Sequence, residues 1–376
     1  KAGKLKKILV TGCMTQRYQG EVAKELPEVD GILGTGSYKD IVDAVETVMA
    51  GGTVSRFDDI NAPVDEFGRV LTTPGHYAFL RIAEGCDNWC AFCIIPKLRG
   101  KYRSRTMEHV LAEARQLADS GVKELIVIAQ DITKYGMDLP EHKRLLPELL
   151  RELCKLDFTW IRLHYLYPDQ ITDELIDVIA EEPKIVKYLD IPLQHVSKRI
   201  LRAMHRPGDG AEFTALIEDM RRRIPGLVLR TSLIVGLPGE TDDEFAELCE
   251  FLQNAAIERV GVFEYSPEEG TEAAEMPDQI DAETKQNRRL IVEELQSGVL
   301  DDYNTSRHGE VMQVLVEGFD DEQQLWYGRT YADSVEVDGH VYFDAMDTEP
   351  GEGEFVSVLI TESLGPDLLG VRQKEA

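Results

Sequence analysis

The sequence predicts an α/β protein whose centre is a parallel β-sheet curled into a partial barrel of six strand–helix units. Six short apolar segments suited to strands recur through the middle of the chain, and an amphipathic helical segment follows each of them. Three cysteines stand directly after the first of these strands. Because such barrels carry their sites at the carboxyl ends of the strands, the cysteines mark the expected site.

The middle region, residues 75–303, supplies the elements of this partial (β/α)6 barrel. Strands are expected at Tyr77–Ile82, Glu124–Ala129, Trp160–Leu166, Val186–Pro192, Val228–Gly236 and Arg259–Tyr265. Helices are expected at Met107–Ser120, Leu146–Leu156, Asp173–Glu182, Lys198–His205, Ala211–Arg223 and Asp242–Ala255. Ser197 and Thr241 stand where helix N-caps belong.

Residues 1–62 predict the remainder of a flavodoxin-like, doubly wound α/β domain. Strands expected at Lys7–Thr11 and Gly31–Leu33 alternate with helices expected at Gln19–Glu25 and Tyr38–Ala50. No element precedes the first strand, so we expect this domain to be truncated. The stretch from Pro63 to Pro74 is expected to connect it to the barrel.

Residues 304–376 predict a small β-barrel of the OB kind, which follows a helix expected at Asp281–Tyr303. Its strands are expected at Val311–Val316, Gln324–Thr330, Ser334–Val337, His340–Asp344 and Phe355–Glu362. From residue 309 onward, sixteen Asp and Glu stand against three Lys and Arg, which gives −13 of the chain's net charge of −28. Such a surface repels nucleic acid and favours a basic protein partner.

The composition is that of a globular protein outside the membrane. The chain has 376 residues, enough for two or three domains, and 43% of them are hydrophobic. It lacks the run of about 18 apolar residues that a membrane helix needs, so we expect no membrane partner. Six cysteines without a disulfide-scaffold pattern favour a reducing compartment, so we expect a cytoplasmic protein.

The strongest motif is C-x3-C-x2-C, formed by Cys86, Cys90 and Cys93. Three thiolates can hold three irons of a cubane iron–sulfur cluster and leave the fourth iron open for chemistry. A structural zinc site or a buried cysteine cluster is the alternative, but no matching second cysteine pair lies nearby. Cys154 and Cys249, in expected helices, are interpreted as packed apolar thiols.

Further motifs make the chain similar to a known family. The cysteine motif, Ala83–Asn88 and Arg99–Arg105 resemble the methylthiotransferase branch of the radical S-adenosylmethionine (SAM) enzymes. The three-part layout resembles that branch too, with its C-terminal TRAM β-barrel. Within the branch, the segments most similar to the ribosomal-protein aspartate methylthiotransferases are Ala129–Gly136, Leu163–Pro168 and Tyr265–Thr271.

The resemblance implies two [4Fe-4S] clusters in the complete protein, and we expect one of them in this chain. Cys86, Cys90 and Cys93 would hold this catalytic cluster, whose open iron binds SAM. Cys13, in a Thr-Gly-Cys context after a strand, matches the third cysteine of the second cluster. The implied reaction places a methylthio group on the β-carbon of an aspartate in small-subunit ribosomal protein twelve, with flavodoxin or ferredoxin as the electron donor.

The resemblance also directs attention to polar residues near the strand ends. Gln130, Gln194, Arg230 and Ser232 could hydrogen-bond SAM or substrate, although a supporting structural role is the alternative. Gly236 lies in a strand–turn–helix segment that resembles the glycine-bearing border of SAM sites.

Other residues near the expected site have more than one interpretation. Arg99, Arg103 and Arg105 would stabilise a reduced cluster or a substrate carboxylate, or they are solvated loop arginines. Asp131 and Asp190 are candidates of the same kind as the polar strand-end residues. His164 and His195 are interpreted as structural.

Three other functions remain open at this point. Close relatives of the resembled enzymes methylthiolate an adenosine in tRNA, which the acidic tail disfavours. A non-catalytic iron–sulfur electron carrier would need a fourth cysteine ligand. A zinc-stabilised RNA-binding adaptor would be colourless and rich in zinc.

Overall fold

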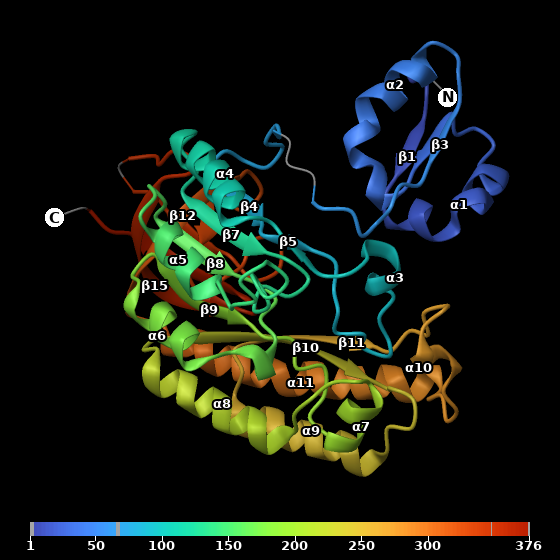
Figure 1. The fold of residues 1–376 in the computed structure, drawn as a ribbon. Helices are drawn as coiled ribbons and strands as arrows, with labels where there is room; N and C mark the ends of the chain where they lie inside the picture. The colour runs from blue at the N-terminus through green and yellow to red at the C-terminus, as the bar shows by residue number, and fades with distance from the viewer. Residues whose placement is uncertain (1–3, 65–67, 347, 375–376) are drawn as a thin grey trace.

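The structure is a computed structural model that describes residues 4–64, 68–346 and 348–374. The described part forms a small N-terminal sheet, a central half-barrel and a closed C-terminal barrel (Figure 1). Part of the expected connector 63–74, namely residues 65–67, lies outside the described residues. None of the described helices is both long and apolar enough to cross a membrane.

The N-terminal region is a three-stranded parallel sheet in the order β1-β2-β3. Its elements are β1 (Leu9–Thr11), α1 (Cys13–Glu25), β2 (Gly31–Leu33), the 3-10 helix η1 (Thr35–Asp40), α2 (Ile41–Met49) and β3 (Val54–Arg56). Helix α1 begins six residues before the expected start, and its backbone leaves helical geometry at Gln19, where the expected helix began. Strand β3 was not expected, because only three residues form it.

The central region confirms the predicted half-barrel. Its sheet is parallel throughout, in the order β11-β10-β9-β8-β7-β4. The strands are β4 (Tyr77–Arg81), β7 (Glu124–Ile128), β8 (Trp160–Leu163), β9 (Ile185–Asp190), β10 (Val228–Val235) and β11 (Arg259–Glu264). A short pair, β5 (Ala83–Glu84) and β6 (Arg103–Ser104), flanks the cysteine loop.

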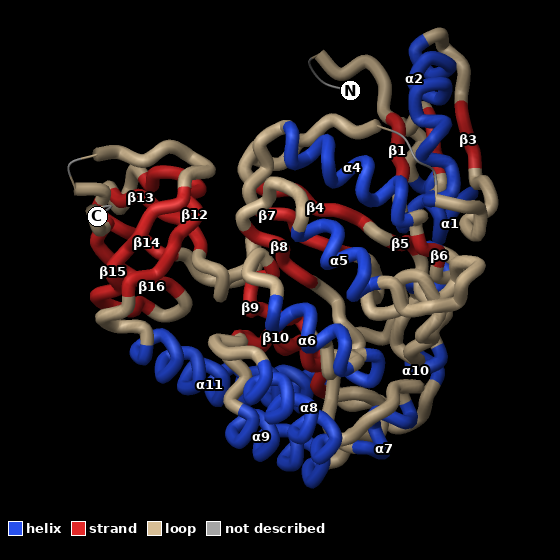
Figure 2. Tube along the Cα trace, turned by 60° about the vertical axis from the view of Figure 1, so that its left-hand side comes forward, coloured by secondary structure: helices blue, strands red, loops and turns tan. Residues whose placement is uncertain are grey.

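Helices cover the outer face of this sheet (Figures 1 and 2). The helices of the central region are α3 (Ile95–Arg99), α4 (Met107–Asp119), α5 (Leu146–Cys154), α6 (Asp173–Glu181), α7 (Lys198–Ala203), α8 (Gly210–Arg223), α9 (Asp242–Ala255), α10 (Glu272–Glu275) and α11 (Ala282–Ser306), with the 3-10 helix η2 (Pro168–Gln170). Of these, α3 and α10 lie away from the outer face (Figure 1). Ser197 and Thr241 cap α7 and α9 as expected, each through its hydroxyl group.

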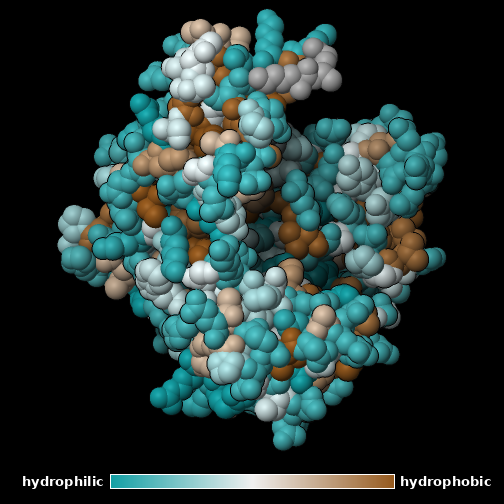
Figure 3. Space-filling model, turned by 90° about the vertical axis from the view of Figure 1, so that its right-hand side faces the viewer, coloured by the Kyte–Doolittle hydropathy of each residue, from teal (hydrophilic) through white to brown (hydrophobic). Residues whose placement is uncertain are grey.

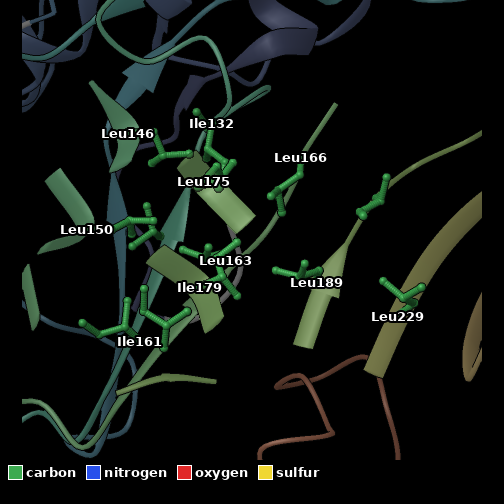
Figure 4. Packing of buried hydrophobic residues seen from close by; sticks show 14 of the residues in the cluster. Ile132, Leu146, Leu150, Ile161, Leu163, Leu166, Leu175, Ile179, Leu189 and Leu229 are labelled. Carbon is green, nitrogen blue, oxygen red and sulfur yellow. The ribbon is translucent and has the colours of Figure 1, made fainter. Parts of the chain in front are cut away.

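The main core lies between the sheet and these helices. Figure 4 shows Leu150 of α5 and Ile179 of α6 beside Ile161 and Leu163 of β8, all of them buried. Every second side chain of a strand points away from this core, because successive side chains of a strand point to opposite faces of the sheet. The inner face of the sheet therefore needs a separate cover, which the C-terminal region supplies.

The C-terminal region is a closed five-stranded barrel in the order β12-β13-β14-β16-β15, which confirms the expected small barrel. Its strands are β12 (Val311–Asp320), β13 (Leu325–Arg329), β14 (Val341–Asp344), β15 (Phe355–Leu364) and β16 (Asp367–Arg372). The strand expected at Ser334–Val337 was wrong, since this segment forms turns. Val335 packs instead against Tyr77 and Ile126 on the inner face of the half-barrel. Strand β16, which was not expected, completes the closure.

Candidate active site

The cysteine loop follows β4 and β5, at the carboxyl end of the sheet. Gly85 opens it with φ 81°, and a Cβ there would lie 2.1 Å from the Lys101 carbonyl oxygen, so glycine is required. Backbone bonds then hold the loop at both sides of Ala91, whose N–H donates to Met204 O at 3.1 Å and whose carbonyl accepts from Ala273 N at 2.9 Å. The loop is therefore a fixed part of the fold.

All three loop cysteines are half-buried thiols. Burial, with smaller contributions from repulsion by Cys90, Asp131 and Cys93, raises the pKa of Cys86 to about 11. Burial also raises the pKa of Cys93, which the charge of Arg206 partly offsets. Thiolates at these positions need a bound cation to stay deprotonated, and the irons of a cluster supply that charge.

Cys90 has two polar neighbours that come from distant parts of the chain. The Tyr167 hydroxyl lies 2.9 Å from Cys90 Sγ, and Arg206 Nη1 lies 3.7 Å from the same sulfur. The guanidinium of Arg206 also stacks on the Tyr167 ring, 4.3 Å from its centroid. Hydrogen bonds and positive charge at a ligand sulfur favour the reduced state of an iron–sulfur cluster.

The donor set can be tested against the two kinds of metal site. Among the described residues, no three His, Cys, Asp or Glu side chains converge closely enough to hold one metal ion. A cubane takes one thiolate at each of three irons, and the three half-buried thiols of this one loop are the donors that it requires.

An open cleft of about 340 Å³ lies at the carboxyl ends of β10 and β11. Its lining residues are Phe92, Gln194, Ser232, Ile234, Phe263, Glu264, Tyr265 and Ser266. Phe92 comes from the cysteine loop itself, so the cleft adjoins the thiols. Figure 3 shows a hollow near the middle of the face that it views, with hydrophobic atoms on its walls. A cleft of this volume falls in the range of small-ligand sites.

Two predicted residues, Gln194 and Ser232, face each other across neighbouring chain segments and line this cleft. Gln194 has φ 71°, and its N–H donates to Ser232 O at 2.9 Å. Arg230 lies one layer deeper, where Nη1 donates to Asp190 Oδ1 at 3.0 Å and lies 3.5 Å from Ser232 Oγ. The structure thus brings three of the predicted residues together.

The structure places the other two predicted residues, Gln130 and Gly236, in different surroundings. Gln130 follows β7, and its side-chain Oε1 is buried with no hydrogen-bond partner among the described residues. A buried acceptor without a protein partner is suited to contact a ligand. Gly236 lies behind the cleft, where an added Cβ would come within 2.3 Å of Lys285 Cγ, and its N–H donates to Glu240. Packing against Lys285 therefore requires a glycine at this position, and the Gly236 N–H already has Glu240 as its hydrogen-bond partner.

Cys13 lies at the first turn of α1, next to the central region. Arg99 Nε donates to Cys13 Sγ at 3.2 Å, and Arg99 Nη1 lies 3.2 Å from Glu84 Oε1. Arg99 therefore connects the predicted ligand of the second cluster with the strand pair at the cysteine loop. Arg103 instead donates to backbone carbonyls, and Arg105 is buried against Glu113.

Sequence reasoning missed Tyr167 and Arg206 as residues of the site. Tyr167 lies in the segment Leu163–Pro168, whose resemblance was recognised without a role for the hydroxyl group. Arg206 precedes Pro207-Gly208, a pair that indicates only a turn. His195 is fully buried and accepts from Ser197 N at 3.0 Å, which gives it a structural role.

Comparisons with known proteins agree with this geometry. The radical SAM superfamily matches residues 80–252, and the TRAM domain matches residues 309–372. The chain is 48% identical over 360 residues to the ribosomal protein uS12 methylthiotransferase RimO of Caldanaerobacter subterraneus subsp. tengcongensis, covering 95% of this chain and 81% of that protein. It is 46% identical over 375 residues to RimO of Lachnoclostridium phytofermentans, covering 99% of this chain and 85% of that protein.

A solved structure supports the fold at a greater evolutionary distance. The radical SAM methyltransferase TsrM of Kitasatospora setae, with cobalamin and a [4Fe-4S] cluster bound, superposes with a TM-score of 0.54 at 14% identity. The match covers 71% of this chain and 58% of TsrM. At this identity the likeness concerns the fold alone.

Proposed function

Because the chain belongs to the RimO family of radical SAM ribosomal protein uS12 methylthiotransferases, we propose that it places a methylthio group on the β-carbon of an aspartate of uS12. The observation that carries this proposal is the half-buried C-x3-C-x2-C loop whose Phe92 lines the adjoining cleft. Domain limits at residues 1–62, 75–303 and 304–376 are part of the same proposal.

The cysteine loop would hold the catalytic [4Fe-4S] cluster through Cys86, Cys90 and Cys93. When bound, the cluster supplies the electron that cleaves SAM reductively. Tyr167 and Arg206 would direct a hydrogen bond and a positive charge at Cys90 Sγ and so make the cluster easier to reduce.

The cleft beside the loop is the proposed SAM site. Gln194 and Ser232 would contact SAM directly, and Gln130 offers a buried acceptor. Arg230 would position the Ser232 hydroxyl group, which it contacts. Gly236, whose N–H is bonded to Glu240, stays a predicted border of the SAM site.

A second [4Fe-4S] cluster would use Cys13, with Arg99 donating to the ligand sulfur. Flavodoxin or ferredoxin is the proposed electron donor, and the cytoplasm is the proposed location. The acidic C-terminal region would attract a basic ribosomal protein and repel RNA, so nucleic acid is not proposed as the direct substrate.

The deciding experiment offers both substrates to the anaerobically reconstituted enzyme. With SAM and a strong reductant, we expect formation of 5′-deoxyadenosine and a methylthio group on an aspartate of uS12, located by mass spectrometry. Parallel incubation with tRNA should leave the RNA unmodified. Transfer to tRNA with no transfer to uS12 would contradict the proposal.

A further inference from the structure

A segment of the C-terminal region, residues 330–338, lies against the inner face of the half-barrel. Val335 packs there against Ile126 of β7, and Ala332 belongs to the buried cluster that contains Trp160 of β8. We call residues 330–338 the plug segment. It joins β13 to β14 of the C-terminal barrel, so this barrel supplies a wall of the central region.

Polar contacts also anchor the plug segment to the half-barrel. Arg259 Nη2 donates to Asp333 Oδ1 at 2.8 Å, and the Tyr188 hydroxyl donates to Asp338 Oδ2 at 2.6 Å. Arg162 Nη1 donates to the carbonyl oxygen of Tyr331 at 2.9 Å. The segment is therefore held in one position by strands β8, β9 and β11.

From the plug segment, a chain of buried polar groups leads to the cleft. Ser334 Oγ lies 3.0 Å from His164 Nε2, and His164 Nδ1 lies 3.6 Å from Asp190 Oδ2. The other oxygen of Asp190 accepts from Arg230 Nη1, which lies 3.5 Å from Ser232 Oγ at the cleft wall. Ser334 and Asp190 are each 1% exposed, so water does not replace these contacts.

We propose that Ser334 is a positioning residue for the cleft: it orients His164, which with Asp190 holds Arg230 and Ser232 in the arrangement that binds SAM. The proposal rests on the proposed role of this cleft as the SAM site. It assigns the C-terminal barrel a part in cofactor binding, in addition to any contact with uS12.

The physical reason is the cost of a buried polar atom without a partner. Removing the Ser334 hydroxyl leaves His164 Nε2 enclosed with nothing to bond, so the imidazole gains by rotating away. Asp190 then loses a neighbour on one side and keeps Arg230 and the Tyr165 N–H, the latter at 3.4 Å. Asp190, held by fewer groups, can then shift and carry with it Arg230 and the Ser232 hydroxyl that Arg230 contacts at the cleft.

The test compares two serines of the same barrel that each pair with a histidine. Ser334→Ala removes the hydroxyl beside His164, whereas the control Ser363→Ala removes one that lies 3.3 Å from His308 Nε2 at the exposed surface. In cluster-loaded protein, we expect the dissociation constant of SAM, measured by equilibrium dialysis, to rise about tenfold for Ser334→Ala only. Ser334→Thr, which keeps the hydroxyl, should restore it.

The readouts separate this inference from a purely structural role of the plug segment. Thermal unfolding of each variant is followed by circular dichroism, and SAM affinity is compared well below the lowest melting temperature. Unchanged affinity in a folded Ser334→Ala protein, or equal losses in Ser334→Ala and Ser363→Ala, would overturn the inference. If Ser334→Ala does not fold, a folded Ser334→Thr protein that binds SAM about tenfold more weakly than the unaltered protein would overturn it as well. Failure of the unaltered protein to bind SAM would refute the proposed function itself.

Discussion

At the scale of single residues, the site depends on thiols whose surroundings differ. Cys86 and Cys93 have raised pKa values, chiefly through burial, whereas Cys90 has Tyr167 and Arg206 at its sulfur. Cys90 is therefore both a predicted ligand and the thiol that contacts the segment after β8 and the α7–α8 connection.

Replacing Cys90 should remove the cluster without unfolding the chain. Cys90→Ala is expected to lose the bound iron and the visible absorbance, and to lower SAM cleavage by more than about 100-fold, since even supporting residues of metal sites are worth 10–100-fold. Iron analysis and 5′-deoxyadenosine formation measure this. Cys249→Ala, a change on helix α9, is the matched control and should keep both. Iron retained at full level in Cys90→Ala would contradict the ligand assignment.

At the scale of elements, one buried ion cluster joins two strands of the half-barrel to the C-terminal barrel. Glu124, at the start of β7, lies 2.6 Å from Arg162 of β8 and 2.6 Å from Arg329 of β13. Burial alone would raise the pKa of Glu124, but the two guanidinium groups lower it to about 2. The carboxylate therefore stays charged wherever the protein is folded near neutral pH.

Neutralising Glu124 should destabilise the protein strongly. Glu124→Gln leaves the buried Arg162 without a countercharge and Arg329 with only that of Glu317, and we expect the free energy of unfolding at pH 7 to fall by about 3–5 kcal/mol. Urea denaturation measures this. The matched control Glu152→Gln breaks an exposed pair with Lys155 and should change the free energy by less than about 1 kcal/mol.

The same pair of variants tests the pH dependence. Because the folded pKa of Glu124 lies below its ordinary value of 4.5, its stabilising contribution is complete above that pH and disappears as the pH falls toward 2. The unaltered protein and Glu152→Gln should both lose this contribution on acidification, and Glu124→Gln should lack it. Equal acid sensitivity of all three proteins would show that Glu124 is not paired as described.

At the scale of the whole molecule, charge is distributed unevenly along the chain. Residues 309–376 carry −13 of the net −28, although they form less than a fifth of the sequence. Negative charge per residue is therefore higher in this barrel than in the rest of the chain, which favours a basic partner there.

Association with uS12 should consequently depend on ionic strength. Raising NaCl from about 50 to about 500 mM is expected to weaken binding by about tenfold or more, mainly through slower association, because salt screens exposed charges. Surface plasmon resonance with immobilised uS12 measures both rates. SAM binding is the internal control, since its cleft is lined mostly by uncharged residues. Binding of uS12 that does not change with salt would exclude steering by the acidic barrel.

The structure differs from the sequence-based expectations where a segment of one region packs against another region. The β-like run Ser334–Val337 alternates apolar and polar residues, yet Val335 faces Tyr77 and Ser334 faces His164, so its partners lie outside its own barrel. The helix expected from Gln19 begins instead at Cys13, and its backbone leaves helical geometry at Gln19.

The sequence by itself determined the six strand–helix units, the closed C-terminal barrel and the trio of thiols, because strand and helix periods and ligand spacings are written within a few neighbouring residues. Only the tertiary structure decided that Tyr167 and Arg206 meet Cys90, that Ser334 meets His164, and that Gly236 lies behind the cleft. Those contacts join residues far apart in the chain. They depend on how the sheet curls and on which segment fills its inner face, and no local pattern records either.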